Sequence, residues 1–148
     1  MKQYFLQTFN PLKWFKAGYT QDEFNDELNT FNSGEELILS WSIQSHKQAQ
    51  IGDISFFMVQ GVEPRGIYGV GEFVSKPYPD KNWNGNGRCM YYVNVLCKKF
   101  TDYTKPFIRI EELKRLIPNY NWSPRSGGMP MGIDVAKALM CRLKWNLL

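Results

Sequence analysis

The sequence predicts an α+β fold, in which five to six strands form a curved or barrel-like sheet and about three helices flank it. Three observations predict this class. Strand-like segments follow one another in the middle of the chain, whereas an α/β protein would alternate strands with helices. Helical spacing is confined to one segment near the start and two segments near the end. The 148 residues are also enough for one domain with a substantial core.

The first half of the chain contains a strand, a helix and then a run of strands. Residues 3–9 are rich in aromatic side chains and precede an Asn-Pro pair, which predicts a strand. Thr20 and Glu23 have the spacing of a capping box, and apolar residues with helical spacing then predict a helix over 21–31. Short apolar segments bounded by turn residues predict strands over 37–43, 54–60 and 67–75.

The second half begins with a long polar segment. Residues 76–90 are rich in Pro, Gly and Asn, which predicts a loop of a length that is often functional. A strand is expected over 90–95 and a short helix over 110–117. Residues 121–132 look irregular, and apolar residues at helical spacing predict a helix over 133–143.

The common catalytic motifs are absent from the sequence. The glycines of 66–71 superficially resemble a dinucleotide-binding loop, but no helix pattern follows them, so a bulge or a close backbone approach is expected. One histidine and three cysteines without C-x-x-C spacing do not form a standard zinc site. No nucleophile–base set and no pair of carboxylates stands out. We therefore expect a binding domain without catalytic residues, a metal or a cofactor.

Composition limits the partners and the location. Eighteen Lys and Arg against 14 Asp and Glu give a net charge of +4, which is compatible with a polyanionic partner but does not require one. No apolar stretch approaches the ~18 residues of a membrane span. The unpaired cysteines indicate a reducing compartment and the first residues lack a signal-peptide pattern, so we expect a cytoplasmic protein.

The aromatic residues are numerous, with 5 Trp, 8 Tyr and 10 Phe. A large ring among polar residues or glycines either covers a core or binds a flat ligand. Five aromatic residues have such neighbours: Trp14, Trp41, Tyr68, Trp83 and Trp122. Nucleobases stack on such rings with about 1–3 kcal/mol per base. Basic residues suited to phosphate contacts are interleaved with the same segments: Arg65, Lys76, Lys81, Arg88 and Arg125. Taken singly, each tryptophan is also compatible with a core or loop-anchoring role.

Several short motifs occur in an order that covers nearly the whole chain. They are Gln7-Thr-Phe-Asn10-Pro11 before Trp14, Trp41-Ser42, the Gly52-Asp53 turn, the segment from Pro64 to Tyr78, and Trp122-Ser-Pro-Arg-Ser126-Gly127. This combination resembles the EVE domain of the PUA-like superfamily. The related YTH domain shares the strand order, and Trp41-Ser42 and Trp83 are similar to the positions of its two cage tryptophans.

The resemblance implies a single PUA-like domain over 1–148 that holds a modified base in an aromatic cage. The implied pocket residues are Trp41, Ser42, Trp83, Tyr68 and Trp14. The implied contacts to the DNA backbone come from Arg65, Lys76, Lys81, Arg88, Arg125 and Ser126.

The resemblance also implies a ligand and a biological setting. The ligand is double-stranded DNA with 5-methylcytosine or 5-hydroxymethylcytosine, whose base must be flipped out of the stack. The setting is a modification-dependent (type IV) restriction system, in which this chain is the N-terminal specificity module and a nuclease such as an HNH domain lies outside it. Two alternatives stay open: an RNA-binding PUA-like domain connected with RNA or tRNA modification, and a structural adaptor whose aromatic residues are all buried.

Overall fold

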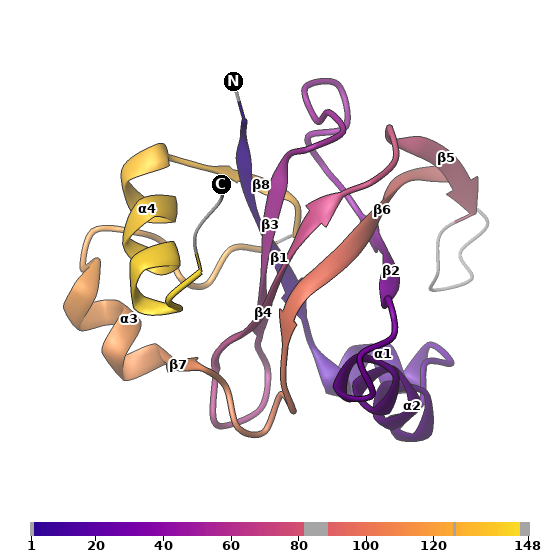
Figure 1. Cartoon of the computed structure of the whole chain (residues 1–148), viewed down its shortest axis with the longest axis horizontal. Helices are drawn as coiled ribbons and strands as arrows, with labels where there is room; N and C mark the ends of the chain where they lie inside the picture. Colours follow the sequence, from indigo (N-terminus) through magenta and orange to yellow (C-terminus); the bar gives the residue numbers. More distant parts are fainter. Residues whose placement is uncertain (1, 82–88, 126, 146–148) are drawn as a thin grey trace.

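The computed structural model describes residues 2–81, 89–125 and 127–145 (Figure 1). In these residues eight strands form one mixed sheet and four helices pack around it. The strands are β1 (Tyr4–Phe9), β2 (Ile38–Ser42), β3 (Ile54–Val59), β4 (Gly66–Phe73), β5 (Tyr78–Lys81), β6 (Cys89–Phe100), β7 (Ile108–Arg109) and β8 (Met129–Met131). The helices are α1 (Pro11–Lys16), α2 (Gln21–Asn32), α3 (Ile110–Leu116) and α4 (Ile133–Arg142).

The sheet has the strand order β2-β6-β4-β3-β1-β8, with β5 paired to β6 and β7 paired to β4. β1 and β3 are parallel, and the other pairs are antiparallel. The connection between these two parallel strands carries α1, α2 and β2. The predicted α+β class with a curved sheet is therefore confirmed.

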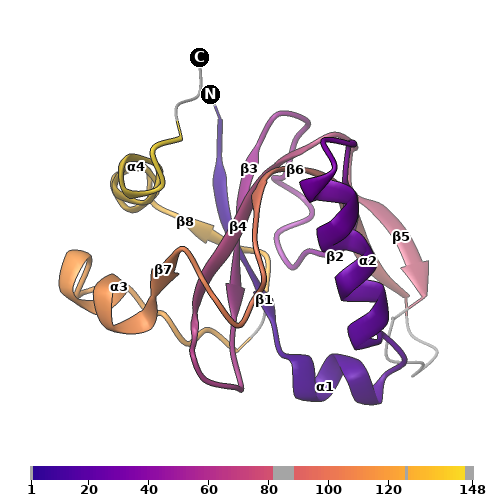
Figure 2. The ribbon, with the colours of Figure 1, turned by 60° about the horizontal axis from the view of Figure 1, so that its bottom comes forward.

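The sheet separates two cores. Figure 2 shows α1 and α2 on one face of the sheet and α3 and α4 on the other. Because successive residues of a strand point to opposite faces, Phe5 and Phe9 of β1 pack on the α1–α2 side, whereas Leu6 packs on the α3–α4 side. All six residues of β3 are buried, as expected for a strand covered on both faces. Most of the aromatic rings lie in the core next to α1 and α2.

Local signals explain both helices of this core. The Thr20 hydroxyl accepts a hydrogen bond from the Glu23 amide at 3.1 Å, so the predicted start of α2 is confirmed. The side chain of Asn10 accepts a hydrogen bond from the Leu12 amide at 3.1 Å, and Pro11 occupies the first helical position of α1. The Asn-Pro pair thus begins a short helix and does not only close the preceding strand.

The segment expected as a long loop contains parts of two strands. β5 pairs with the first residues of β6, and β6 extends well beyond the predicted 90–95. β5 and β8 are both short and each contains a proline. A proline weakens a strand pattern in the sequence, yet it is tolerated at the edge of a sheet. This explains why the structure has more strands than the five to six predicted.

The glycines of β4 allow the strand to approach its neighbours closely, as predicted. A Cβ atom on Gly71 would lie 2.5 Å from Val95 Cγ1 and 2.7 Å from the Leu96 carbonyl oxygen. The register between β4 and β6 shifts between Val70 and Gly71, which marks a bulge or irregularity there. These glycines serve the packing of the sheet.

Candidate functional site

The end of β2 brings three of the predicted pocket residues together. Trp41 is only 3% exposed; its ring stacks on Phe57 with centroids 5.1 Å apart and an interplanar angle of 18°. The ring of Trp14 in α1 also contacts Trp41, with ring centroids 5.1 Å apart and an interplanar angle of 56°. Ser42 follows on the same strand and is half-buried. Trp14 and Trp41 form an aromatic wall that lines two cavities.

The first of these, which we call the amide cavity, has a volume of about 580 Å³. It lies between the end of β1, the start of α1 and the segment before β8. It is lined by Gln7, Thr8, Asn10, Lys13, Trp14, Trp41, Ser42, Gln60, Pro124, Arg125 and Gly127. Lys13 and Arg125 are exposed, so they place two positive charges at its edge.

Buried polar atoms converge on the amide cavity. Five buried side-chain polar atoms have no hydrogen-bond partner among the described residues, and three of them are amide atoms of residues that line this cavity: Gln7 Nε2 and Oε1, and Gln60 Nε2. A buried donor or acceptor without a partner costs about 1–3 kcal/mol. The set contains an acceptor and two donors beside an aromatic wall, so it suits a flat ligand with a hydrogen-bonding edge.

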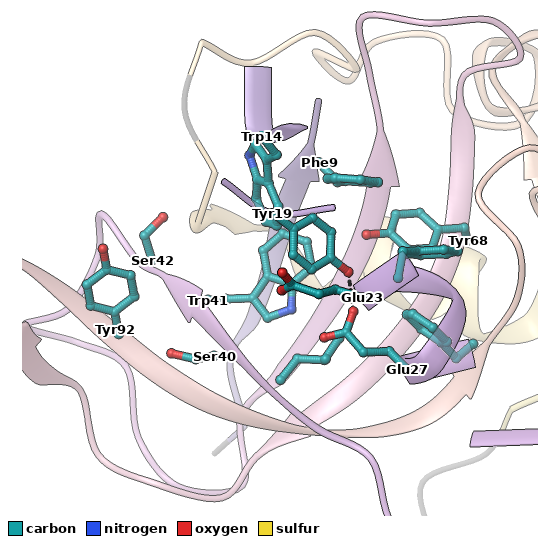
Figure 3. A pocket seen from close by; sticks show the side chains of 13 residues that line it. Phe9, Trp14, Tyr19, Glu23, Glu27, Ser40, Trp41, Ser42, Tyr68 and Tyr92 are labelled. Atoms are coloured by element: carbon teal, nitrogen blue, oxygen red, sulfur yellow. Dashed lines mark hydrogen bonds between the residues drawn. The ribbon is translucent and has the colours of Figure 1, made fainter. Parts of the chain in front are cut away.

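The second cavity, which we call the acidic cavity, has a volume of about 280 Å³ and lies beneath α2 (Figure 3). It shares Trp14, Trp41 and Ser42 with the amide cavity. Its other lining residues are Phe9, Tyr19, Glu23, Phe24, Glu27, Leu39, Ser40, Tyr68, Tyr92 and Phe100.

A carboxyl group inside the acidic cavity has a shifted pKa. Burial raises the pKa of Glu27 above its usual range, and the neighbouring carboxylates Glu23 and Asp26 raise it further. The Tyr19 hydroxyl donates a hydrogen bond to Glu27, which opposes the shift (Figure 3). Burial also raises the pKa of Tyr68, well above its usual value. Tyr68 lines the acidic cavity and not the amide cavity, so the predicted pocket residues divide between the two.

The predicted phosphate-binding residues are spread over the molecule. Arg125 lines the amide cavity, whereas the Arg65 guanidinium donates hydrogen bonds to the Trp122 carbonyl at 2.7 Å and to Ser123 Oγ at 2.8 Å. Lys76 lines a separate hollow together with residues 49–51, and Lys81 is exposed at the end of β5. Three predicted residues lie outside the described residues: Trp83, Arg88 and Ser126.

Sequence reasoning missed the polar lining of the amide cavity. Gln7 is completely buried, although glutamine is mostly exposed in proteins. The sequence does contain a signal for this burial: Gln7 lies in β1, where strand alternation puts it on the same face of the sheet as Phe5 and Phe9. Gln60 follows β3 directly and carried no comparable signal.

The described part of the chain contains no group of three or more His, Cys, Asp or Glu side chains that could hold a metal ion. None of its helices is long and apolar enough to cross a membrane.

Solved structures share this architecture. Neither a protein-family model nor a curated protein matches the chain. A hypothetical protein from Leishmania major is 16% identical with a TM-score of 0.65, over 97% of this chain and 96% of that one. Human THYN1, solved in complex with 5-methylcytosine-containing DNA, is 15% identical with a TM-score of 0.63, over 99% of this chain and 100% of its own. This chain shares its fold with these two proteins.

The Mmi1 YTH domain, solved in complex with RNA, is 12% identical with a TM-score of 0.50, over 96% of this chain and 77% of that one. The fold of this chain is therefore also similar to that of a YTH domain, as the sequence resemblance implied. At identities of 12–16% the similarity concerns the fold alone.

Proposed function

We propose that this chain is a reader of modified bases in nucleic acid, and that the amide cavity receives the base. The single observation that carries the proposal is the convergence of three features in this cavity. These are the wall formed by Trp14 and Trp41, the buried amide of Gln7, and the positive charges of Lys13 and Arg125. A nucleotide offers a matching flat ring, a hydrogen-bonding edge and a phosphate.

We further propose double-stranded DNA with 5-methylcytosine or 5-hydroxymethylcytosine as the ligand. Human THYN1, which has the same fold, was solved with 5-methylcytosine-containing DNA, and this supports the choice. A base inside a duplex must flip out at a cost of a few kcal/mol. Stacking of the base on an aromatic wall contributes about 1–3 kcal/mol of binding free energy, and hydrogen bonds to the buried amides add to it. Ser42 is proposed as a further partner of the base edge.

The backbone contacts follow from the position of the cavity. Lys13 and Arg125 are proposed to hold the phosphates that flank the flipped base, because both side chains line the cavity and are exposed. Lys76 and Lys81 are exposed but do not line the cavity, so they are proposed to contact other phosphates of the duplex. Trp83, Arg88 and Ser126 remain proposed site residues on the sequence resemblance.

No catalytic step is proposed for this chain. Cleavage of modified DNA would require a nuclease, such as an HNH domain, joined to or associated with this module in a type IV restriction system. RNA is the alternative ligand, because the Mmi1 YTH domain with a similar fold was solved with RNA.

Two variants of α1 test the assignment of the cavity. Trp14→Leu removes half of the aromatic wall, whereas Phe15→Leu changes a half-buried ring of the same helix that lies outside the cavity lining. Affinity is measured for methylated duplex DNA, the unmethylated duplex and single-stranded RNA at one stated salt concentration.

We expect Trp14→Leu to lower the affinity for methylated DNA about tenfold or more, and Phe15→Leu to leave the methyl preference unchanged. Equal loss of methyl preference in both variants would contradict the placement of the base in the amide cavity. Tighter binding of RNA by the wild type would favour the alternative ligand.

A further inference from the structure

The charges of this chain are segregated along the sequence. Between Lys16 and Lys47 there is no Lys or Arg, but there are six of the 14 carboxylates: Asp22, Glu23, Asp26, Glu27, Glu35 and Glu36. The whole chain nevertheless has a net charge of +4. The segment that contains α2 is therefore locally negative, which disfavours a polyanion there.

The acidic cavity under α2 has walls that favour a cation. Its aromatic lining comprises Phe9, Trp14, Tyr19, Phe24, Trp41, Tyr68, Tyr92 and Phe100. The faces of such rings carry a negative partial charge that attracts ammonium groups. Glu23 and Glu27 add carboxylates from one face of α2, where residues four apart are neighbours. None of the described lining residues is basic.

A buried donor at the base of the acidic cavity provides a second, independent indication of a ligand. Trp41 Nε1 is buried and has no hydrogen-bond partner among the described residues. Figure 3 shows this nitrogen on the side of the indole ring that faces Glu27, away from Ser42. A ligand in this cavity would therefore meet carboxylates on one side and an indole N–H on another.

We propose that the acidic cavity binds a small alkylammonium ion that carries a hydroxyl or similar hydrogen-bond acceptor. The ammonium group lies against the aromatic faces, close to Glu23 and Glu27. The acceptor receives the hydrogen bond from Trp41 Nε1. This proposal does not rest on the base-reading function, because Glu23 and Glu27 do not line the amide cavity.

The first experiment compares a cation with its neutral analogue of the same shape. Choline and 3,3-dimethylbutan-1-ol differ in that a carbon replaces the charged nitrogen. Binding of each to the full chain is followed by NMR chemical-shift changes and by calorimetry. We expect choline to bind at least about tenfold more tightly, since a desolvated cation–π contact and the carboxylates favour only the charged molecule. Equal affinities, or no saturable binding of choline, would overturn the proposal.

The second experiment locates the site on α2 with two double variants that remove the same charge. Glu23→Gln with Glu27→Gln neutralises the carboxylates of the cavity, whereas Asp22→Asn with Asp26→Asn neutralises two exposed carboxylates of the same helix that do not line it. We expect the first pair to weaken choline binding about tenfold or more and the second pair to change it less than about threefold.

An equal loss in both pairs would show that the general charge of α2 attracts choline, and would contradict a defined site. Circular dichroism confirms that each double variant is folded. If the glutamine pair does not fold, the comparison of choline with its neutral analogue on the wild-type chain still decides the proposal.

Discussion

Replacing Trp41 with alanine should destabilise the whole domain, because this side chain belongs to the core as well as to the aromatic wall that lines both cavities. Its ring is 3% exposed and contacts Phe57 and Trp14, each with a centroid distance of 5.1 Å. Truncation of a buried tryptophan costs about 3–5 kcal/mol, and each aromatic pair contributes about 0.5–1.5 kcal/mol beyond its buried area. With two such pairs lost, we expect a value near the upper end, about 4–5 kcal/mol.

This loss is comparable with the lower range of domain stability, about 5 kcal/mol. Urea unfolding followed by circular dichroism gives the free energy of unfolding of the wild type and of each variant. Trp41→Phe keeps a ring against Phe57 and should cost only about 1–2 kcal/mol, so it is the variant to use in binding assays. A loss below about 1 kcal/mol for Trp41→Ala would refute the core position of Trp41.

Three further predictions concern other parts of the structure. Gly71→Ala should cost about 1–3 kcal/mol in urea unfolding, because its Cβ would meet β6 at 2.5 Å; unchanged stability would contradict that close approach. Lys13→Gln and Arg125→Gln should each weaken DNA binding for every sequence. Each should also reduce the slope of log affinity against log salt concentration by about 1, and slopes equal to that of the wild type would exclude phosphate contacts there. Glu27 has a raised pKa in the folded state, so the folded protein binds this proton more tightly than the unfolded chain, and wild-type stability should fall as pH rises from the ordinary glutamate range through the folded pKa. Glu27→Gln should remove this fall, and identical pH profiles of unfolding would argue against the shift.

The sequence was informative where one local signal dominated. The capping residue Thr20 and the helical spacing of the residues after it predicted α2, and the apolar run at 54–60 predicted β3. Cys141 shows the limit of such patterns: its apolar neighbours at helical spacing predict a small core residue, and this prediction is wrong because Cys141 is exposed. The buried face of α4 is set by Ala136 and Leu139, and Cys141 lies off that face.

Part of the candidate site was also predictable. Trp41 and Trp14 were predicted as pocket residues because they are large rings among polar neighbours, and the structure places them against each other. The same reasoning selected Trp122, which is 3% exposed and donates from Nε1 to the Ile117 carbonyl at 3.1 Å, so it holds the closing segment against the core. A ring in a polar segment does not reveal whether it covers a core or faces a ligand. That distinction depends on long-range contacts, and so does the absence, among the described residues, of a hydrogen-bond partner for the Gln7 side chain.

The central claim is that the chain distinguishes a modified base from an unmodified one. It is tested most directly by equilibrium binding of the wild-type chain to three duplexes, identical except for one central cytosine that is unmodified, 5-methylated or 5-hydroxymethylated, at a single salt concentration. A pocket that accommodates one extra methyl group discriminates by about 1–3 kcal/mol, so we predict that at least one modified duplex binds about tenfold more tightly than the unmodified duplex. Equal affinities for all three duplexes would contradict the claim.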